Sequence, residues 1–422
     1  MDHVLLMKVT SIMCIVEAVQ RKKKALNRLQ KKRSVWVKPW IERRQLHHGA
    51  YYDLLKELEA EDIKRDKYFP HMDKSSFDDI LEKITPLIKR EDTHMRKAIS
   101  PEERLALTLR FLTSGNTYQD MECLYRVPRS TLSKLIPETC KAIYDVLKED
   151  YLKVPETEDD WLKVAEGFNE KWQFPNCIGA LDGQIIQINP RPGWVSMYKN
   201  NFSIIQMALV DADYKFIYVD VGCRVDDGGV WHGCSLKKAL DDGTINIPGP
   251  QCLPGREKPM PHVIVADKVF PLKETIMKPY PSRGISKEKE IFNYRLSRAR
   301  RTAENAFGIQ ANRFRVFQQP FRAHPNNVRS MVLSTCVLHN YLLTKPSSRN
   351  IYTLNNLDIE NIKTGIVTEG SWRRGPTPNG IAPLESQCGN RAGGPAKLVQ
   401  NEFCDYFNGN GKVEWEWRVG LE

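Results

Sequence analysis

Three carboxylates lie far apart in the chain, each in a distinctive local sequence. They are Asp182 in Gly179-Ala-Leu-Asp182-Gly183, Asp267 directly after Val263-Ile-Val-Ala266, and Glu304 in Glu304-Asn-Ala-Phe307-Gly308. Hard cations such as Mg²⁺ prefer oxygen ligands, and two of them about 4 Å apart can hold both the attacking and the leaving oxygen of a phosphodiester displacement. If folding gathers these acids, they predict a divalent metal site for phosphodiester chemistry, with Mg²⁺ as the expected ion and Mn²⁺ as the alternative.

Each carboxylate also has an ordinary structural interpretation. Asp182 and Asp267 both follow apolar runs, which suits a ligand at a strand end but equally suits a turn or capping residue. Glu304 follows Arg300 and Arg301 by about one helical turn, so a surface ion pair is its alternative. The metal-site interpretation therefore depends on the three acids meeting in one pocket.

A fourth acid, Asp227, lies in the segment Arg224-Val-Asp-Asp227-Gly-Gly-Val230 and is a candidate additional metal ligand. Asp226 beside it remains an alternative for the same role. The sequence contains no nucleophile elbow, no Walker loop and no dinucleotide-binding fingerprint, which argues against the commonest rival enzyme classes.

The composition favours a polyanionic partner. The formal net charge is +11, from 63 Lys and Arg against 52 Asp and Glu, and neutralising phosphates releases condensed counterions. Basic residues crowd the stretch from Arg21 to Arg44, which suits a nuclear import signal or a DNA-binding arm, or else a solvated charged helix face. We therefore expect DNA as the partner and the nucleus as the location, with a cytoplasmic pool as the alternative.

Neither the cysteines nor the first residues indicate export. The ten cysteines include no C-x-x-C pair, so neither a zinc ribbon nor a disulfide framework is expected, and the thiols should be reduced. Asp2, Lys8 and Glu17 interrupt the moderately apolar residues 1–19. We expect no secretion signal and no membrane span.

The N-terminal part of the chain is expected to be helical. After a basic tail, residues 1–34, a small helical region over 35–98 carries apolar residues at three-to-four spacing. Residues 99–155 then contain a helix that starts at the Ser100-Pro101 cap, a short second helix, a turn at Arg126-Val-Pro128 and a third helix. This order is typical of a helix-turn-helix DNA-binding region, or of an ordinary three-helix bundle.

The first residues of the third helix would face the major groove and donate to phosphates or base edges. Pro137 complicates that helix, because it lacks an amide donor and should kink or end it. The residues expected to contact DNA there are Arg129, Ser130, Thr131, Ser133 and Lys134.

Residues 172–344 change to strand-like runs followed by long helices, which indicates an α/β layer architecture. Residues 345–400 lose periodicity and carry Gly and Pro patches, so a flexible connector is expected. The last segment, residues 401–422, regains aromatic residues and should pack on the core. The expected strands are 177–188, 203–210, 215–222 and 262–266, and the expected helices are 286–313 and 326–343.

Several motifs, in order along the chain, resemble those of PIF/Harbinger superfamily transposases and of nuclease-like proteins domesticated from them, which are DDE superfamily endonucleases. The resemblance runs from about Trp36 to Trp417. The matching signatures are Trp36-Val-Lys-Pro-Trp40, Leu109-Arg-Phe-Leu112 with Gly115-Asn116, Gly179-Ala-Leu-Asp182-Gly183, Tyr198-Lys199, Ser203-Ile-Ile205, Asp227-Gly-Gly229, Phe270-Pro-Leu272 with Pro279-Tyr280, Asn293-Tyr294, Glu304-Asn-Ala-Phe307-Gly308 and Leu338-His-Asn340.

The resemblance implies an RNase H-like catalytic core in which Asp182, Asp267 and Glu304 form a DDE triad, with Asp227 as an additional metal ligand. It also implies a helix-turn-helix before the core and a Myb-like or SANT-like accessory protein, and it leaves homo-oligomer formation open. His339 belongs to a packing helix and is expected to be structural. The departures from the family pattern are Met197, where many relatives have Asn, and Gln310-Ala311 in place of a hydrophobic residue and lysine; neither touches the triad.

The sequence supports two alternative functions. In the first, Asp182 bridges two Mg²⁺ ions while the other acids hold one each, water cleaves a DNA strand, and the freed 3′-hydroxyl can attack target DNA. Lys199, Arg298 and Arg301 are the expected phosphate contacts. In the second, the chain is a domesticated, non-catalytic DNA-binding or adaptor protein that retains the transposase fold.

Overall fold

The chain divides into two compact units, residues 1–48 and residues 49–422. In the first unit the described elements are the short helix α2, Pro39–Glu42, and the 3-10 turn η1, Arg43–Leu46. Most of the predicted basic tail lies outside the described residues. The computed structural model describes residues 20–22, 38–46, 49–52, 72–94, 97–189, 203–223, 231, 233–281, 283–353, 357–360, 366–375, 378–384 and 393–413.

Among the described residues of the second unit, four helices come first, and local capping explains where they end. The Ser100 side chain accepts from the backbone N–H of Glu103, and Gly115 ends the same helix in the left-handed conformation with φ of 68°, which suits a residue without a Cβ. Thr117 and Asp120 form a reciprocal capping box at the next helix. These helices are α4, Lys74–Ile88; α5, Pro101–Ser114; α6, Tyr118–Tyr125; and α7, Arg129–Tyr151.

Helix α7 does not end at Pro137, contrary to one expectation from the sequence. It continues from Arg129 to Tyr151 with Pro137 buried inside it. Its apolar side packs along α11, Pro325–Thr344, and against α4 and α5, so tertiary packing outweighs the loss of one helical hydrogen bond. The order of three helices is as predicted from the sequence, but they are packed into the same unit as the rest of the chain.

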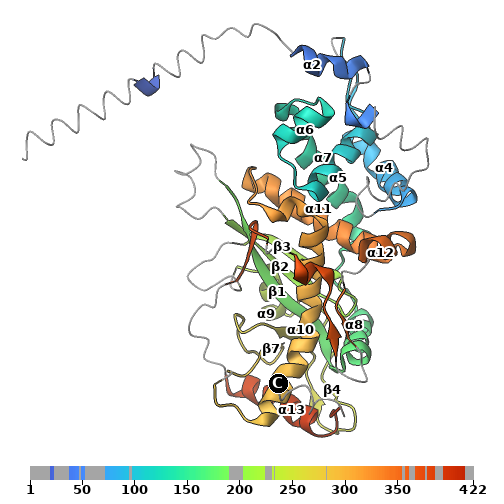
Figure 1. Ribbon diagram of the computed structural model, residues 1–422. Helices are drawn as coiled ribbons and strands as arrows, with labels where there is room; N and C mark the ends of the chain where they lie inside the picture. Colours follow the sequence, from blue (N-terminus) through green and yellow to red (C-terminus); the bar gives the residue numbers. More distant parts are fainter. Residues whose placement is uncertain are drawn as a thin grey trace, which may run out of the picture. The chain divides into compact units, whose positions relative to one another are not determined.

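A mixed sheet forms the centre of the unit (Figure 1). Its order is β3-β2-β1-β6-β7, with β10 also paired to β1. The pairs β1–β2 and β2–β3 are antiparallel, whereas β6 is parallel to β1 and to β7. The main strands are β1, Cys177–Gln187; β2, Ser203–Val210; β3, Phe216–Cys223; β6, Val263–Ala266; and β7, Ile276–Met277.

Helices cover both faces of the sheet, which gives the mixed α/β architecture that the sequence predicts. The 27-residue helix α10, Lys287–Arg313, lies along β1, β2 and β6, and α11 packs on β3 (Figure 1). On the other face, α8, Glu158–Trp172, and α9, Ser235–Asp241, bury Trp161 and Leu236 in a second apolar cluster. A strand that is buried on both faces has a nearly continuous apolar sequence, and Val263–Ala266 has such a sequence.

Along one edge of β1 the paired strand changes from β6 to β10. Parallel pairing with β6 extends to Leu181, opposite Ala266. Antiparallel pairing with β10, Ile381–Pro383, starts at Gln184, opposite Pro383. Between these two pairings a short part of β1 has no ladder partner on this side among the described residues, and a cavity opens there.

The described parts of residues 345–400, predicted as a flexible connector, form several short elements. Among them, β10 joins the central sheet and α12 packs on α11. In the described part of the chain no helix is long and apolar enough to cross a membrane. The remaining elements are β4, Gln251–Cys252; β5, Pro259–Met260; η4, Arg315–Gln318; α12, Pro346–Thr353; β8, Ile359–Glu360; β9, Val367–Thr368; η5, Ser371–Arg374; and α13, Gly394–Asn408.

Candidate active site

Two of the predicted carboxylates come from neighbouring parallel strands. Leu181 of β1 pairs with Ala266 of β6, and the next residues along the two strands are Asp182 and Asp267. Because side chains alternate between the faces of a sheet, both acids point to the face that α10 covers. Both acids were predicted at strand ends. Asp267 does follow the end of β6, whereas Asp182 lies within β1.

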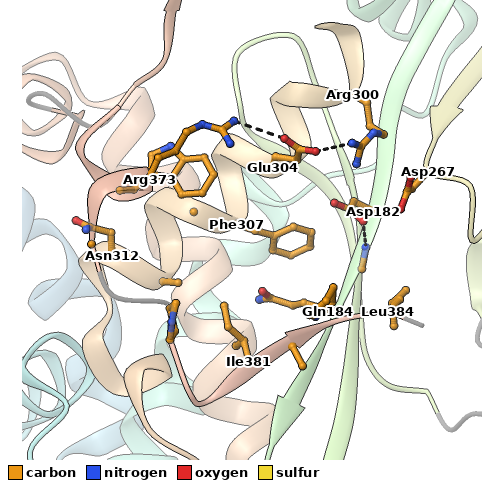
Figure 2. A pocket seen from close by; sticks show the side chains of 18 of the residues that line it. Asp182, Gln184, Asp267, Arg300, Glu304, Phe307, Asn312, Arg373, Ile381 and Leu384 are labelled. Carbon is orange, nitrogen blue, oxygen red and sulfur yellow. Dashed lines mark hydrogen bonds and ion pairs between the residues drawn. The ribbon is translucent and has the colours of Figure 1, made fainter. Parts of the chain in front are cut away.

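Glu304 completes the set from α10. All three carboxylates line one cavity of about 840 Å³, and Figure 2 shows Asp182 and Asp267 close together with Glu304 above them. Arg300, Phe307 and other residues of α10 form one wall of this cavity, and β1 and β10 form another. The structure therefore brings together Asp182, Asp267 and Glu304 from three remote segments.

The environment of Asp182 disfavours its charge. Burial raises the pKa of Asp182 to about 7, Arg300 and the Gly183 amide oppose that rise, and the negative charges of Glu304 and Asp267 add to it. The Gly183 amide donates to Asp182 Oδ1 at 2.8 Å. A partly dehydrated carboxylate with two acidic neighbours gains most from an added cation, so its surroundings suit a metal ligand.

Glu304 is bound by two arginines. Arg300 Nη2 lies 2.5 Å from Glu304 Oε1, and Arg373 Nη2 lies 3.5 Å from Glu304 Oε2 (Figure 2). The ion pair with Arg300 is the alternative that the helical spacing predicted, and it forms inside the cavity.

The donor set fits a hard cation at Asp182 and Asp267, while Glu304 already has counter-ions. Carboxylate oxygens are the ligands that Mg²⁺ and Mn²⁺ prefer. Within the described ranges, no group of three or more His, Cys, Asp or Glu side chains is arranged to hold a metal ion. Glu304 would have to turn from an arginine toward the two aspartates to become a third ligand.

A segment that the sequence assigned to the connector completes the cavity. Trp372 Nε1 donates to Asn305 Oδ1 at 2.9 Å, and the Trp372 ring lies so close to Gly308 that an added Cβ would be 2.3 Å from ring carbon Cδ2. The Arg373 guanidinium stacks on that ring at 4.3 Å. Glu304, Asn305 and Gly308 of one motif therefore all contact the same two residues, and no local sequence signal indicated that pairing.

Asp358 fixes Arg373 in place. Arg373 Nη2 and Nε donate to Asp358 Oδ2 at 2.8 and 3.0 Å, and the Asp358 side chain is only 1% exposed. The Gly370 amide also donates to Asp358. A buried carboxylate that receives several donors holds its partner firmly, so Arg373 is held at the cavity wall.

Arg298 and Arg301, predicted to contact phosphates, lie away from the three carboxylates. Arg298 is fully buried, and its Nε lies 2.7 Å from Glu360 Oε1. Arg301 Nη1 lies 3.4 Å from Glu360 Oε2. Buried Arg298 and half-buried Arg301 are both paired with Glu360 and so contribute to the packing, and a phosphate contact by either stays a prediction. Arg300, between them on the helix, is the arginine that reaches the cavity.

The predicted DNA-contacting residues lie at the start of α7. Arg129 is bound to Glu122 of α6 at 3.1 Å, and Arg129, Ser130 and Ser133 line a second hollow of about 740 Å³. Lys134 is exposed and Thr131 is half-buried. Asp226, Asp227 and Lys199 lie outside the described residues.

His339 is structural, as expected. It is fully buried between Tyr352, whose hydroxyl is 2.8 Å from Nδ1, and the Tyr214 carbonyl oxygen, 2.8 Å from Nε2. The next residue, Asn340, bonds both backbone groups of Phe216 at the start of β3. The Leu338-His-Asn340 signature therefore joins α11 to the sheet.

Comparison with known proteins gives a family match and two relatives. The match to the DDE superfamily endonuclease model covers residues 181–340. The chain is similar to the protein Antagonist of like heterochromatin protein 1 of Arabidopsis thaliana, with 24% identity over 258 residues that cover 58% of this chain and 63% of that protein. It is also similar to protein ALP1-like of Arabidopsis thaliana, with 25% identity over 257 residues that cover 58% of this chain and 61% of that protein.

The chain thus spans about three-fifths of the length of these curated relatives. No solved structure matches it significantly. The family match contains all three carboxylates and the Leu338-His-Asn340 signature, whereas Trp372 and Arg373 lie beyond it. The matches confirm the resemblance that the motifs indicated, and over residues 181–340 the chain is similar to the DDE superfamily endonucleases.

Proposed function

We propose that the chain is a metal-dependent DNA endonuclease of the PIF/Harbinger transposase type, with an RNase H-like core. The observation that carries the proposal is the meeting of Asp182, Asp267 and Glu304 in one cavity. The family match over residues 181–340 and the mixed sheet flanked by helices support the same conclusion. Asp227 is proposed as an additional ligand.

The proposed chemistry is hydrolysis of one strand. A bond forms between a water oxygen and phosphorus, the bond from phosphorus to the 3′-oxygen breaks, and the leaving oxygen takes up a proton. A divalent cation held by these carboxylates would supply Lewis acidity and lower the pKa of the attacking water. The freed 3′-hydroxyl could then serve in strand transfer.

The chain's own residues would orient the reacting groups. Asp182 and Asp267 provide neighbouring oxygen donors, and Glu304 provides a third from the opposite wall. Arg300 and Arg373 bring positive charge to the cavity, where preorganised cations stabilise the charge that develops on a phosphate in the transition state. The same proposal includes a Myb-like or SANT-like accessory protein as a partner and the nucleus as the location.

A cleavage assay tests this function. The purified full chain should nick supercoiled DNA with Mg²⁺ or Mn²⁺ and lose the activity when the metal is chelated. Asp182→Asn and Glu304→Gln should each lower the rate by more than the roughly 100-fold that loss of an outer-shell partner costs. Asp213→Asn is the matched control, since that carboxylate is half-exposed in a hairpin and pairs with Lys171.

Two results would contradict the proposal. One is a pure, folded protein that cuts no DNA with either metal. The other is an Asp182→Asn variant that cuts as fast as Asp213→Asn.

The second candidate is a non-catalytic DNA-binding or adaptor protein that retains the fold. It is favoured by the engagement of both Glu304 oxygens by Arg300 and Arg373, which leaves that acid bound without a metal. In this case the combined Asp182→Asn, Asp267→Asn and Glu304→Gln variant should bind DNA as tightly as the wild type, and neither should cut it.

A further inference from the structure

Two further hollows lie in a row between the catalytic cavity and the start of α7, and each shares lining residues with the next. The cavity shares Pro378, Ile381 and Ala382 with a neighbouring hollow of about 540 Å³. That hollow in turn shares Asn189 and Pro320 with the hollow of about 740 Å³ that Arg129, Ser130 and Ser133 line. We call these three adjoining spaces the strand groove. It runs from Asp182 to the predicted DNA-contacting residues.

One short segment, residues 315–323, borders the whole groove. Arg315 and Gln318 line the catalytic cavity, Pro320 lines the middle hollow, and Arg322 lines the outer one. The segment is fixed to the end of β1, since Phe321 N donates to Gln187 O at 2.9 Å and its carbonyl accepts from Asn189 N at 2.8 Å. A rigid backbone therefore presents its side chains along the groove.

Outside the catalytic cavity, the charged side chains that line the groove are all positive. None of the described residues that line the middle and outer hollows is Asp or Glu. Arg315 and Arg322 are exposed, and no ion pair involves either within the described ranges. A basic groove without acids attracts any polyanion by charge alone, so the chemistry of the lining must identify which polyanion it fits.

That lining suits unpaired bases. Aromatic and amide side chains both line the outer hollow: Phe111 and Tyr118, stacked on each other at 5.0 Å, lie there with Asn116, Gln119 and Gln319. Aromatic faces stack on nucleobases, amides bond their edges, and arginines bind the phosphates between them. An acidic peptide carries no bases that would use this combination of aromatic and amide groups.

We propose that the strand groove binds one unpaired DNA strand and leads it from α7 to the catalytic carboxylates, with Arg315 and Arg322 as its phosphate contacts. The inference rests on the proposed function for the direction of the strand, but binding itself requires neither metal nor cleavage. It also gives Ser130 and Ser133 a role beside a single strand instead of in a major groove.

The test measures DNA binding without chemistry. Fluorescence anisotropy with a labelled single-stranded oligonucleotide, in EDTA, compares the full-length wild type with Arg315→Ala, Arg322→Ala and the double variant. Each substitution should weaken binding several-fold and lower the slope of log affinity against log salt by about 0.7, the value for one phosphate contact on a single strand. Arg349→Ala is the matched control, an exposed arginine on α12 that lines none of the three hollows.

The outcomes separate this inference from the proposed function. A double variant that binds the oligonucleotide like Arg349→Ala, or a wild type that does not bind it, overturns the strand groove. A double variant that loses duplex affinity as much as single-strand affinity also overturns it, because that result assigns the arginines to duplex binding. If the wild type binds through Arg315 and Arg322 but never cuts DNA, the strand groove stands and the endonuclease proposal fails.

Discussion

At the scale of single residues, the structure explains three positions of the motif Glu304-Asn-Ala-Phe307-Gly308 by their contacts, which the spacing of residues in the sequence did not predict. Its glutamate enters the cavity, its asparagine accepts from Trp372, and its glycine leaves space for the Trp372 ring. The motif therefore serves both as a source of one carboxylate and as a docking surface for η5. Arg373, brought in by that docking, becomes a counter-ion of Glu304.

The contact between Arg373 and Glu304 should weaken metal binding. A guanidinium and a divalent cation compete for the same carboxylate oxygens, so Arg373→Gln should bind Mn²⁺ several-fold more tightly in calorimetry than the wild type does. Arg374→Gln is the control, because it removes the same charge from an exposed neighbour. Equal Mn²⁺ affinity in the two variants would show that Arg373 does not compete for Glu304.

Gly308 should be required only while Trp372 is present. Gly308→Ala places a Cβ 2.3 Å from the Trp372 ring, and such overpacking costs about 1–3 kcal/mol of unfolding free energy. In a Trp372→Ala background the clash is absent, and the better helix propensity of alanine should stabilise α10 by up to about 1 kcal/mol. Denaturant unfolding of the four proteins measures both effects, and a Gly308→Ala penalty of equal size in both backgrounds contradicts the docking.

At the scale of elements, asparagine and histidine side chains join helices to the sheet and to the loops beside it. Asn340 of α11 bonds the backbone of Phe216, and Asn293 of α10 bonds the backbone N–H of Tyr280 at 2.7 Å and its carbonyl at 3.1 Å. Two signatures of the sequence resemblance, Pro279-Tyr280 and Asn293-Tyr294, therefore contact each other. Buried polar groups that are fully bonded in this way specify how an element docks.

Burial of His339 predicts a loss of stability in acid. Burial lowers its pKa from 6.5 to about 4, and the Tyr214 carbonyl opposes that shift only in part. Since the folded state holds the neutral ring, the stabilisation is complete above pH 6.5 and is lost as the pH falls toward 4, by up to roughly 3 kcal/mol. The difference in unfolding free energy between wild type and His339→Gln should therefore narrow over this range in urea titrations, and a constant difference contradicts the prediction.

The sequence predicted elements whose signals are local. The Ser100 cap, the Thr117 helix start and the apolar run before Asp267 all depend on neighbours in sequence, and each predicted element formed. Contacts between distant segments left no such signal. The pairing of β10 with β1 and the burial of Arg298 against Glu360 depend on tertiary packing, which periodicity does not encode.

In the candidate site, too, the residues with local sequence signals were predicted and those brought in by distant contacts were not. Asp182, Asp267 and Glu304 were predicted from their local sequences and from the resemblance, and the structure gathers them. Asp182 was expected at a strand end, but β1 continues to Gln187, where β2 pairs with one edge of it and β10 with the other. Trp372 lies in a segment rich in Gly and Pro, where composition indicated a connector instead of a cavity wall.

At the scale of the whole molecule, the predicted helix-turn-helix and the central sheet belong to one unit, residues 49–422. Helix α11 connects them, because α7 packs along it while its other residues contact β3. Tyr341 of α11 also donates to Asp79 of α4 at 2.7 Å. A movement of the N-terminal helices independent of the sheet would break these contacts, so in the proposed function DNA would meet both parts at a fixed distance.

This continuity predicts a single unfolding transition for residues 49–422. Ile143 of α7 is fully buried, and Ile143→Ala should cost about 2–5 kcal/mol of unfolding free energy. Among the described residues the buried tryptophans are Trp161, Trp172 and Trp231, and all of them lie outside α7. Their fluorescence should nevertheless shift to the same lower midpoint as the helical circular dichroism, because one cooperative unit loses its stability as a whole.

Glu149→Ala, exposed on the same helix, should leave both midpoints unchanged. If tryptophan fluorescence keeps the wild-type midpoint in Ile143→Ala while circular dichroism falls in two steps, the helical region unfolds by itself, and a fixed distance between α7 and the carboxylates no longer follows.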